Sequence, residues 1–458
     1  MADSRLTRTI SSAGSLTTWT FSTWIKRSVL GDSDTIMAQG SSGDNFMEIH
    51  FDGNDCLDWR QYVSGAYQGR LHTDRMFRDT SAWYNIVCQW DTTNGTAGDR
   101  MKMWINGVQE TSFQATTNPT SSRASIWNST TGTMNIGSAW NAAYYFNGYQ
   151  SHTAFVNNAI VAPTVFGSTD STSGIWKFKS PAPTWGTNGF HLKYENSGNL
   201  GLDSSGQSNT FTVAGSLRQA LDTPSNVYCT MNPLQATDAG QSAGFSFGNT
   251  KVVGNWSHWQ RVFGTLGATK GKWFYEFKNL QNDGSAGHCR IGWDSIDFIN
   301  YDSSGQSSYY SGLTLDREGK LRGGIGGYSG YSPNAVQMTA ISGGNFSYTA
   351  NDILGMAIDL DNETFSVYKN GTLEINAYSY AGLSNNSISK SRGFFIGPSW
   401  NWYSTSGNNN RSCFNFGNGH FESTAITSAG SNGNGSLFEY DVPSGYYAWN
   451  TKNINTYG

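Results

Sequence analysis

The chain has few charged residues, and neither sign is in large excess. Lys, Arg, Asp and Glu make up 14% of its 458 residues, whereas about 25% is typical of soluble domains. The formal net charge is −4, so the sequence lacks the basic surface by which proteins bind nucleic acid. We therefore expect no nucleic-acid partner.

Cysteines and long apolar runs are also scarce. The five cysteines are odd in number, lie far apart and form no CxxC pair, which argues against a disulfide framework or a zinc site. No window approaches the 18 apolar residues of a membrane-spanning helix, and the first residues include no apolar signal region. We expect the chain to fold in the cytoplasm without membrane insertion. Heptads and collagen-like triplets are absent as well, which excludes a fibrous shaft.

Aromatic residues and glycine, in contrast, are abundant. The chain has 17 Trp, 23 Tyr, 25 Phe and 54 Gly. Together with many Ser, Thr and Asn, this composition is typical of all-β proteins with many turns. It also suits surfaces that recognise sugars or proteins through aromatic rings and amides.

Two distant stretches predict the same hairpin. In residues 101–108, Met101, Met103 and Ile105 alternate with side chains of the opposite face, and Asn-Gly follows. Alternation with period two indicates a strand with one buried face, and Asn-Gly tolerates the positive φ angles of a tight turn. Residues 364–371 repeat the pattern too far along the chain for one sandwich. We predict two antiparallel β domains in tandem.

The first part of the chain contains an ordered series of strand-like segments, at residues 19–26, 81–87, 102–107, 134–137 and 146–149. This series resembles the laminin-G/concanavalin-like jelly roll, most closely the version in bacteriophage structural proteins. Residues 77–84 and 188–193 resemble phrases that recur in those phage proteins. The resemblance implies a first sandwich over residues 1–180.

The later part of the chain contains a second ordered series, at residues 271–277, 289–293, 352–359, 364–371 and 414–417. This series resembles the SPRY (B30.2-like) β-sandwich, which is also concanavalin-like. The predicted fold class is therefore all-β, with two tandem concanavalin-like antiparallel sandwiches of the jelly-roll type. We expect the second domain at 236–458 and a short irregular connecting region at 181–235, which either completes the first sandwich or begins a small middle unit.

Enzymatic chemistry finds little support in the sequence. The hydrolase phrase Glu-x-Asp-x-x-Glu is absent. Glu48 and Asp52 share a strand face, but roughly 13 Å separate them at about 3.3 Å per residue, too far for a glycosidase pair unless the strand bends. Asp359 and Asp361 lie in a hairpin, where turn chemistry explains them. The seven histidines are scattered. We expect no enzyme and no cofactor.

Calcium is a separate question, because some laminin-G relatives bind it at the rim of the sandwich. Asp203 and Asp302 each begin an Asp-Ser-Ser-Gly turn. A calcium site needs about 6–8 oxygens, and neither phrase supplies two carboxylates. An Asx turn is the alternative. We expect no metal site, with Asp203 and Asp302 as the candidates if calcium binds.

Three loops use the residue types of antibody paratopes, namely Tyr, Trp, Ser, Gly and Asn. They are residues 300–311, 323–332 and 399–408, and in SPRY relatives loops of this kind form the partner-binding face. The predicted contact residues are Tyr301, Tyr310, Tyr328, Tyr331, Trp400 and Trp402. The alternative is that these aromatics cap the sandwich edges. A similar loop in the first domain adds the secondary candidates Trp140, Tyr144 and Tyr145.

The two resemblances together imply a non-enzymatic virion structural protein of a tailed phage. It would be displayed in many copies on a symmetric particle, as a capsid decoration or a tail-associated knob. Its partners would be other virion proteins and a host surface glycan. A free glycan-binding adhesin and a glycan depolymerase are the alternatives.

Overall fold

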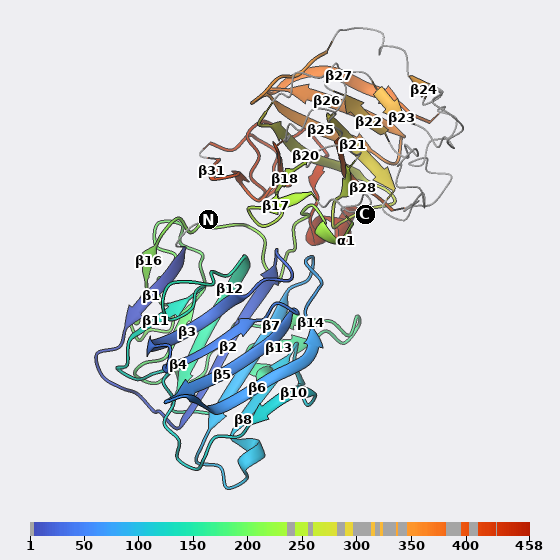
Figure 1. Ribbon diagram of the computed structural model, residues 1–458. Helices are drawn as coiled ribbons and strands as arrows, with labels where there is room; N and C mark the ends of the chain where they lie inside the picture. Colours follow the sequence, from blue (N-terminus) through green and yellow to red (C-terminus); the bar gives the residue numbers. More distant parts are fainter. Residues whose placement is uncertain are drawn as a thin grey trace, which may run out of the picture. The chain divides into compact units, whose positions relative to one another are not determined.

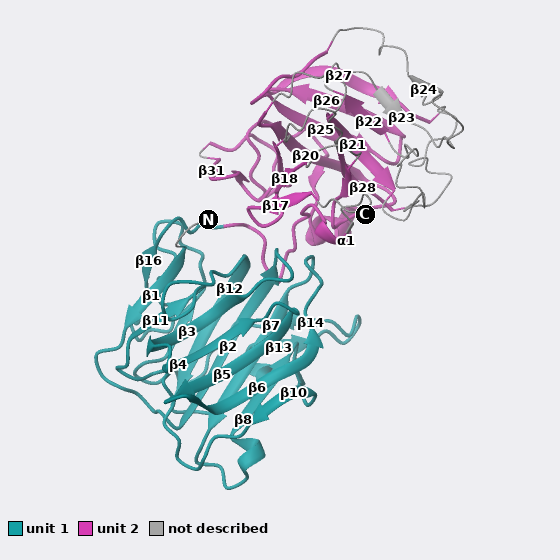
Figure 2. Ribbon diagram, viewed as in Figure 1, with its two compact units in different colours: residues 1–219 teal, residues 220–458 magenta. Residues whose placement is uncertain are grey.

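The computed structural model describes residues 4–235, 243–254, 260–281, 289–295, 313–316, 321–323, 336–337, 346–381, 395–402, 411–426 and 428–458. The chain divides into two compact units, residues 1–219 and 220–458 (Figure 2). Both units are built almost entirely of β-strands (Figure 1), which confirms the predicted fold class. The division falls after residue 219, rather than at the predicted limits of 180 and 236.

The first unit consists of two antiparallel sheets. The larger has, in spatial order, β10 (Phe113–Thr117), β6 (Ala66–Met76), β5 (Cys56–Val63), β4 (Asn45–Phe51), β3 (Asp34–Ser42), β11 (Thr133–Ile136), β1 (Arg5–Thr9) and β16 (Thr212–Ala214). The smaller has β15 (Phe190–Leu192), β12 (Gly148–Asn157), β2 (Thr18–Arg27), β7 (Tyr84–Asp91), β8 (Met101–Ile105) and β9 (Val108–Gln109). A separate hairpin joins β13 (Gly167–Thr169) to β14 (Trp176–Phe178), and short 3-10 turns lie at η1 (Ala97–Asp99) and η2 (Pro163–Val165).

The inward faces of the two sheets share an aromatic core. Trp19 of β2 stacks on Trp90 of β7 with ring centroids 6.0 Å apart, and its ring meets the edge of Trp59 of β5 at 5.8 Å. All three side chains are fully buried. Burial of such large apolar surfaces is the main stabilising contribution in a sandwich of this kind.

Part of the predicted connecting region completes the first unit. Strand β15 pairs with β12, and β16 pairs with β1 at the edge of the larger sheet. Residues 181–219 therefore belong to the first sandwich, whereas residues 220–235 belong to the second unit.

The second unit has the same two-sheet construction. One sheet contains β17 (Gly244–Ser246), β18 (Lys251–Val253), β29 (Arg411–Asn415), β20 (Lys272–Asn279), β25 (Ile353–Asp359), β26 (Thr364–Lys369) and β27 (Thr372–Ser379), with β32 (Tyr447–Ala448) pairing in parallel to β20. The other contains β19 (Gln260–Phe263), β28 (Ile396–Trp402), β21 (Cys289–Ser295), β22 (Leu313–Asp316), β23 (Leu321–Gly323) and β24 (Val336–Gln337). Smaller elements are η3 (Pro233–Gln235), the pair β30 (His420–Phe421) and β31 (Thr424–Ala425), and α1 (Thr451–Tyr457).

Both predicted Asn-Gly hairpins are present. Asn106 and Gly107 have φ angles of 49° and 77°, and Asn370 and Gly371 have 48° and 82°. Each asparagine Oδ1 also accepts a backbone N–H from the adjacent strand, 2.8 Å from the nitrogen of Asn85 in the first unit and 2.9 Å from that of Ile353 in the second. Both units therefore close this hairpin with an Asn-Gly turn whose asparagine side chain also bonds to the neighbouring strand.

In the described ranges, no helix combines the length and the apolar character needed to cross a bilayer.

Candidate functional site

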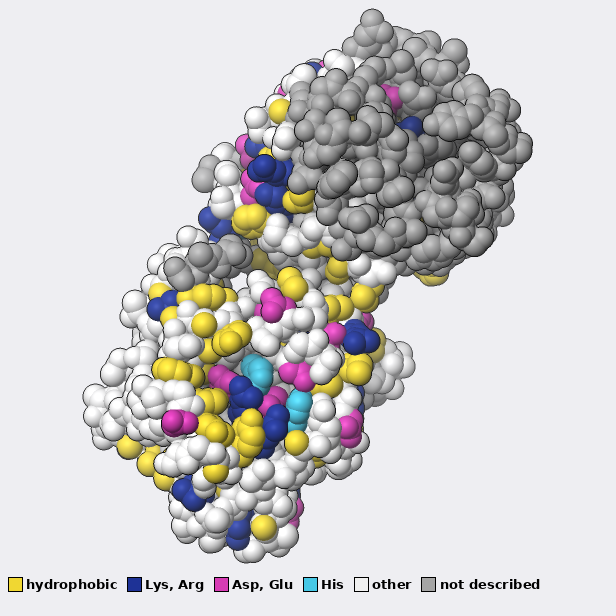
Figure 3. Space-filling view, in the orientation of Figure 1, with side chains coloured by type: hydrophobic (Ala, Val, Ile, Leu, Met, Phe, Trp, Pro, Cys, Tyr) yellow, Lys and Arg dark blue, Asp and Glu magenta, His cyan; other side chains and the backbone are white. Residues whose placement is uncertain are grey.

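The outer face of strands β4, β5 and β6 in the first unit gathers charged, histidine and aromatic side chains. Along β4, Met47, Ile49 and Phe51 point into the core, so Glu48 and His50 project from the opposite side of the sheet. The same alternation in β5 and β6 adds more polar residues to this side. Figure 3 shows both signs of charge and histidine together on this face. We call it the β4–β6 face; it comprises Phe46, Glu48, His50, Asp58, Arg60, Tyr62, Tyr67, Arg70 and His72.

Two guanidinium groups and two carboxylates form a lattice across these strands. Arg60 lies opposite Glu48 in the strand register and donates from Nη2 to Glu48 Oε1 at 2.7 Å. Arg70 binds Asp58 with two nitrogens, at 3.0 Å from Nε and 2.8 Å from Nη2. Asp58 is only 1% exposed, and a carboxylate this deeply buried requires charged partners. The lattice therefore holds four long side chains in fixed positions.

His72 extends the lattice toward the end of β4. Its Nδ1 lies 3.2 Å from Arg70 Nη2, and its Nε2 lies 3.0 Å from Asp52 Oδ2. Since arginine can only donate, Nδ1 accepts and the Nε2–H donates to Asp52. Burial alone would raise the pKa of Asp52, but the backbone N–H groups of Cys56 and Asn54 and the His72 ring hold this pKa below its ordinary value.

His50 differs from the other polar residues of the face. It is 8% exposed, and within the described part of the chain its Nδ1 has no hydrogen-bond partner. The nearest acidic atom, Glu48 Oε1, lies 3.7 Å away. Burial, followed by the positive charge of Arg60, lowers the pKa of His50. The ring is therefore neutral at pH 7, and its Nδ1 is closed to solvent without a hydrogen-bond partner among the described residues.

An aromatic row runs beside the charged lattice. Trp140 stacks on Phe46 with centroids 6.5 Å apart, Phe46 lies 5.8 Å from Tyr62, and Tyr62 lies 5.1 Å from Tyr67. The guanidinium of Arg70 sits 4.5 Å above the Tyr67 ring. Trp140, Tyr62 and Tyr67 are half-buried, so each keeps part of its ring open to solvent.

The charged groups of this face bond mainly to one another. Glu48 and Asp58 each accept hydrogen bonds from a guanidinium group, and both ring nitrogens of His72 are engaged. Glu48 and Asp52, considered above as a possible pair, make separate contacts with Arg60 and His72.

The second carboxylate pair considered above belongs to a turn. Asp359 Oδ1 accepts the backbone N–H groups of Asp361 and Asn362, at 3.1 and 3.0 Å. This arrangement confirms the turn chemistry predicted for the pair.

Most of the predicted loop residues of the second unit lie outside the described residues. They are Tyr301, Tyr310, Tyr328 and Tyr331, together with the calcium candidate Asp302. Trp402 ends strand β28, and its side chain also lies outside the described part.

The prediction for Trp400 is corrected by the structure. This residue lies inside strand β28, not in a loop, and its side chain is fully buried in the core. Its Nε1 donates to Ser412 Oγ at 3.0 Å. Alternate residues of the strand, including Ile396, face the same core, so Trp400 packs there and is closed to a ligand.

The three candidate residues of the aromatic loop in the first unit have different surroundings. Trp140 joins the β4–β6 face, whereas Tyr144 is 60% exposed. Tyr145 donates its hydroxyl to Ala142 O at 2.6 Å and accepts a hydrogen bond from Arg5, so it fixes the loop itself.

Asp203 has its carboxylate occupied by a turn. It accepts the backbone N–H groups of His191, Ser205 and Asn209 at 2.8–2.9 Å, and the Ser205 hydroxyl at 2.8 Å. These contacts form an Asx turn, which was the alternative to calcium binding for Asp203. Over the described ranges, no group of three or more His, Cys, Asp or Glu side chains is placed to hold a metal.

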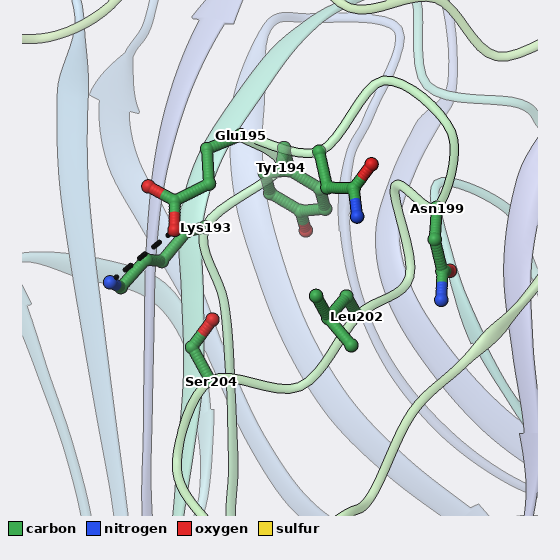
Figure 4. Close-up of a pocket in the computed structure, with 7 residues that line it drawn as sticks. Lys193, Tyr194, Glu195, Asn199, Leu202 and Ser204 are labelled. Atoms are coloured by element: carbon green, nitrogen blue, oxygen red, sulfur yellow. Dashed lines mark ion pairs between the residues drawn. The ribbon is translucent and has the colours of Figure 1, made fainter.

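A shallow depression in the first unit lies beside the loop that follows β15 (Figure 4). Its walls come from Lys193, Tyr194, Glu195, Asn196, Asn199, Leu202 and Ser204. Its free volume is about 10 Å³, about the space of one water molecule and far below the usual 300–1,000 Å³ of a small-molecule site. We therefore do not consider it the functional site.

The β4–β6 face escaped sequence reasoning although its signal was present. In three successive strands, charged residues or histidine recur two positions apart, as in Glu48 and His50 or Arg70 and His72. Ordinary exposed strand faces give the same pattern. Only the strand register shows that these residues contact one another.

Comparison with known proteins agrees with the first unit. Residues 5–166 match the family model of the concanavalin A-like lectin/glucanases superfamily, which confirms the laminin-G/concanavalin-like prediction for this part of the chain. No curated protein matches the sequence.

Solved structures that match this chain include three of different origin. The SPRY domain of human HERC1 is 17% identical, with 40% of this chain and 96% of that chain covered and a TM-score of 0.29. Mouse laminin α1 domains LG4-5 are 8% identical, with coverages of 90% and 84% and a TM-score of 0.30. A putative carbohydrate binding protein from Bacteroides ovatus is 14% identical, with coverages of 47% and 60% and a TM-score of 0.29.

Proposed function

We propose that the protein is a non-enzymatic adhesion protein whose first unit binds glycan on the β4–β6 face. One observation carries this proposal: partly open aromatic rings lie beside a fixed lattice of guanidinium and carboxylate groups. Aromatic faces pack against the apolar faces of sugar rings, and charged groups hydrogen-bond to hydroxyls. The lectin-type fold of residues 5–166 is consistent with this use.

The test is a glycan array probed with the full chain and three variants. Tyr62→Ala and Tyr67→Ala remove the two open rings of the aromatic row, and we expect each to weaken binding by about tenfold. Tyr144→Ala is the matched control, because Tyr144 is more exposed but contributes no ring to the row. Equal binding by all four proteins, with the folds intact, would exclude this face as the site.

The setting that we propose is the surface of a tailed-phage virion, where the protein serves as a capsid decoration or tail-associated knob in many copies. The support is the resemblance of segments such as 77–84 and 188–193 to phrases of phage structural proteins. In this setting the second unit contacts other virion proteins, and Tyr301, Tyr310, Tyr328, Tyr331 and Trp402 remain the proposed contacts.

Labelling purified particles with an antibody to the chain, viewed by electron microscopy, tests the setting. We expect label at symmetric positions on the capsid or tail. Tyr328→Ala and Trp402→Ala should reduce incorporation into particles. Unlabelled particles would favour a free adhesin, and release of reducing ends from a bound polysaccharide would favour a depolymerase.

A further inference from the structure

The hydrogen-bonding groups left open on the β4–β6 face are of mixed type. In the described structure, Glu48 Oε2 accepts no hydrogen bond and Arg70 Nη1 donates none, because their partners use the other atoms of each group. The hydroxyls of Tyr62 and Tyr67 also bond to none of the described residues. The buried ring of His50 lies on the same face, but its Nδ1, unpartnered within the described ranges, is closed to solvent. Both donors and acceptors are therefore open on this face.

A sugar hydroxyl matches such a mixture, because it both donates and accepts. A carboxylate or sulfate ester can only accept at pH 7, so it would leave the acceptor Glu48 Oε2 unsatisfied. The cost of leaving a buried polar group without a partner is large compared with the gain from one hydrogen bond.

The balance of charges on the face also favours an uncharged ligand. Arg60 and Arg70 face the three carboxylates of Glu48, Asp52 and Asp58, so the carboxylates exceed the guanidinium groups by one. Arg75, further along β6, is paired with Glu110 at 2.7 Å. The face therefore offers no surplus positive charge to an anionic polymer.

We propose that the β4–β6 face selects uncharged glycans and binds them without calcium. This inference rests on the proposed glycan-binding function and adds the class of ligand. Hexose rings stack along Trp140, Tyr62 and Tyr67, and their hydroxyls bond to Glu48 Oε2 and Arg70 Nη1. The lattice contributes orientation and selectivity, because an acidic sugar meets an uncompensated carboxylate.

Matched pairs of polymers test the ligand class with the full chain. The probes are dextran, galactomannan and mixed-linkage β-glucan, each beside its carboxymethylated and its sulfated derivative. We expect at least one neutral polymer to bind, with derivatives weaker by about tenfold. Its affinity should change less than about twofold when NaCl rises from about 0.05 to about 0.5 M, or when a chelator of divalent cations is added.

Asp52→Asn refines the test, because it removes the excess negative charge while keeping a side chain of the same size. We expect the ratio of acidic-derivative to neutral-polymer affinity to rise about threefold or more. Asp99→Asn is the control, since Asp99 pairs with Lys102 in a different sheet region, and it should leave the ratio unchanged.

The two proposals fail differently. Preferential binding of a carboxymethylated or sulfated polymer, weakened about tenfold by salt or abolished by the chelator, would overturn the inference and leave glycan binding standing. No binding of any polymer by the wild-type chain would overturn glycan binding itself, and the inference with it.

Discussion

At the residue scale, two glycines show why particular positions in the hairpins admit no side chain. Gly107 has a φ angle of 77°, and a Cβ built there would lie 2.5 Å from the ring of Trp176. Gly371 has the same relation to Tyr440, at 2.7 Å. In both units an aromatic ring packs directly on the turn. The glycine therefore permits both the positive φ angle of the turn and the close approach of the ring.

Replacement of Gly107 by alanine, compared with a control glycine, should separate the cost of the positive φ angle from the cost of the clash with Trp176. The matched control is Gly174→Ala in the β13–β14 hairpin, because Gly174 also has a positive φ of 71°, but a methyl group added there would meet no heavy atom within 4 Å. We expect Gly174→Ala to lower the free energy of unfolding by about 1 kcal/mol through backbone strain. Gly107→Ala should cost about 3 kcal/mol, because Trp176 must also move.

Urea unfolding of the full chain measures both values. Equal losses in the two variants would show that the contact with Trp176 contributes nothing to the stability of the hairpin.

The residues of the β4–β6 face show the limit of sequence reasoning at this scale. The Asn-Gly turns were predictable because a turn depends on adjacent residues. The lattice of Glu48, Arg60 and Arg70 depends on the register of three strands, which no single segment reveals. Trp400 was predicted in a loop because strand β28 has aromatic and polar residues in succession, and only the position of the core shows which side chain is inside.

At the scale of elements, strand β20 fastens the C-terminal segment to its sheet through a buried carboxylate. Glu276 accepts the backbone N–H groups of Glu439 and Tyr440 and the amide of Asn415, each at 2.9 Å. Phe274, two residues earlier on β20, meets the ring edge of Phe438 at 5.0 Å. Polar and apolar contacts thus hold the same segment.

This carboxylate should make the stability of the second unit depend on pH. Burial raises the pKa of Glu276 to about 7, from 4.5 for the ordinary group. The folded state therefore binds the proton more tightly than the unfolded state. The contribution to stability is complete below pH 4.5 and is lost as the pH rises through 7, by about 3 kcal/mol.

Glu276→Gln cannot ionise and should lack this part of the pH dependence. Unfolding free energies at several pH values between about 4.5 and 8, for the wild type and the variant, give the comparison. Groups other than Glu276 titrate in both proteins, so their contributions cancel in the difference between the two unfolding free energies. That difference should therefore change across this range. A constant difference would contradict the raised pKa.

At the scale of the whole molecule, the two units have separate hydrophobic cores. The core of the first unit gathers around Trp19, Trp59 and Trp90, and that of the second around Trp273, Trp293 and Trp400. Since stability in such domains comes mainly from burial within one core, we expect two unfolding transitions in calorimetry. Gly107→Ala should shift one transition and Glu276→Gln the other. A single transition that moves with both variants would contradict this independence.

The two-domain organisation was predictable, but its limits were not. Repeated hairpin signals indicated two sandwiches, because each needs its own alternating strands. The short strands β15 and β16 contain three residues each, too few for a clear alternation, so their pairing with the first unit was decided only by tertiary contacts.

The most direct test of glycan recognition is a crystal structure of residues 1–458 with a bound neutral oligosaccharide from the polymer that binds. We expect the sugar rings over Tyr62, Tyr67 and Trp140, with hydroxyls in hydrogen-bonding distance of Glu48 and Arg70. An oligosaccharide held instead at a loop rim, around a metal ion or in the second unit would contradict the assignment of the β4–β6 face.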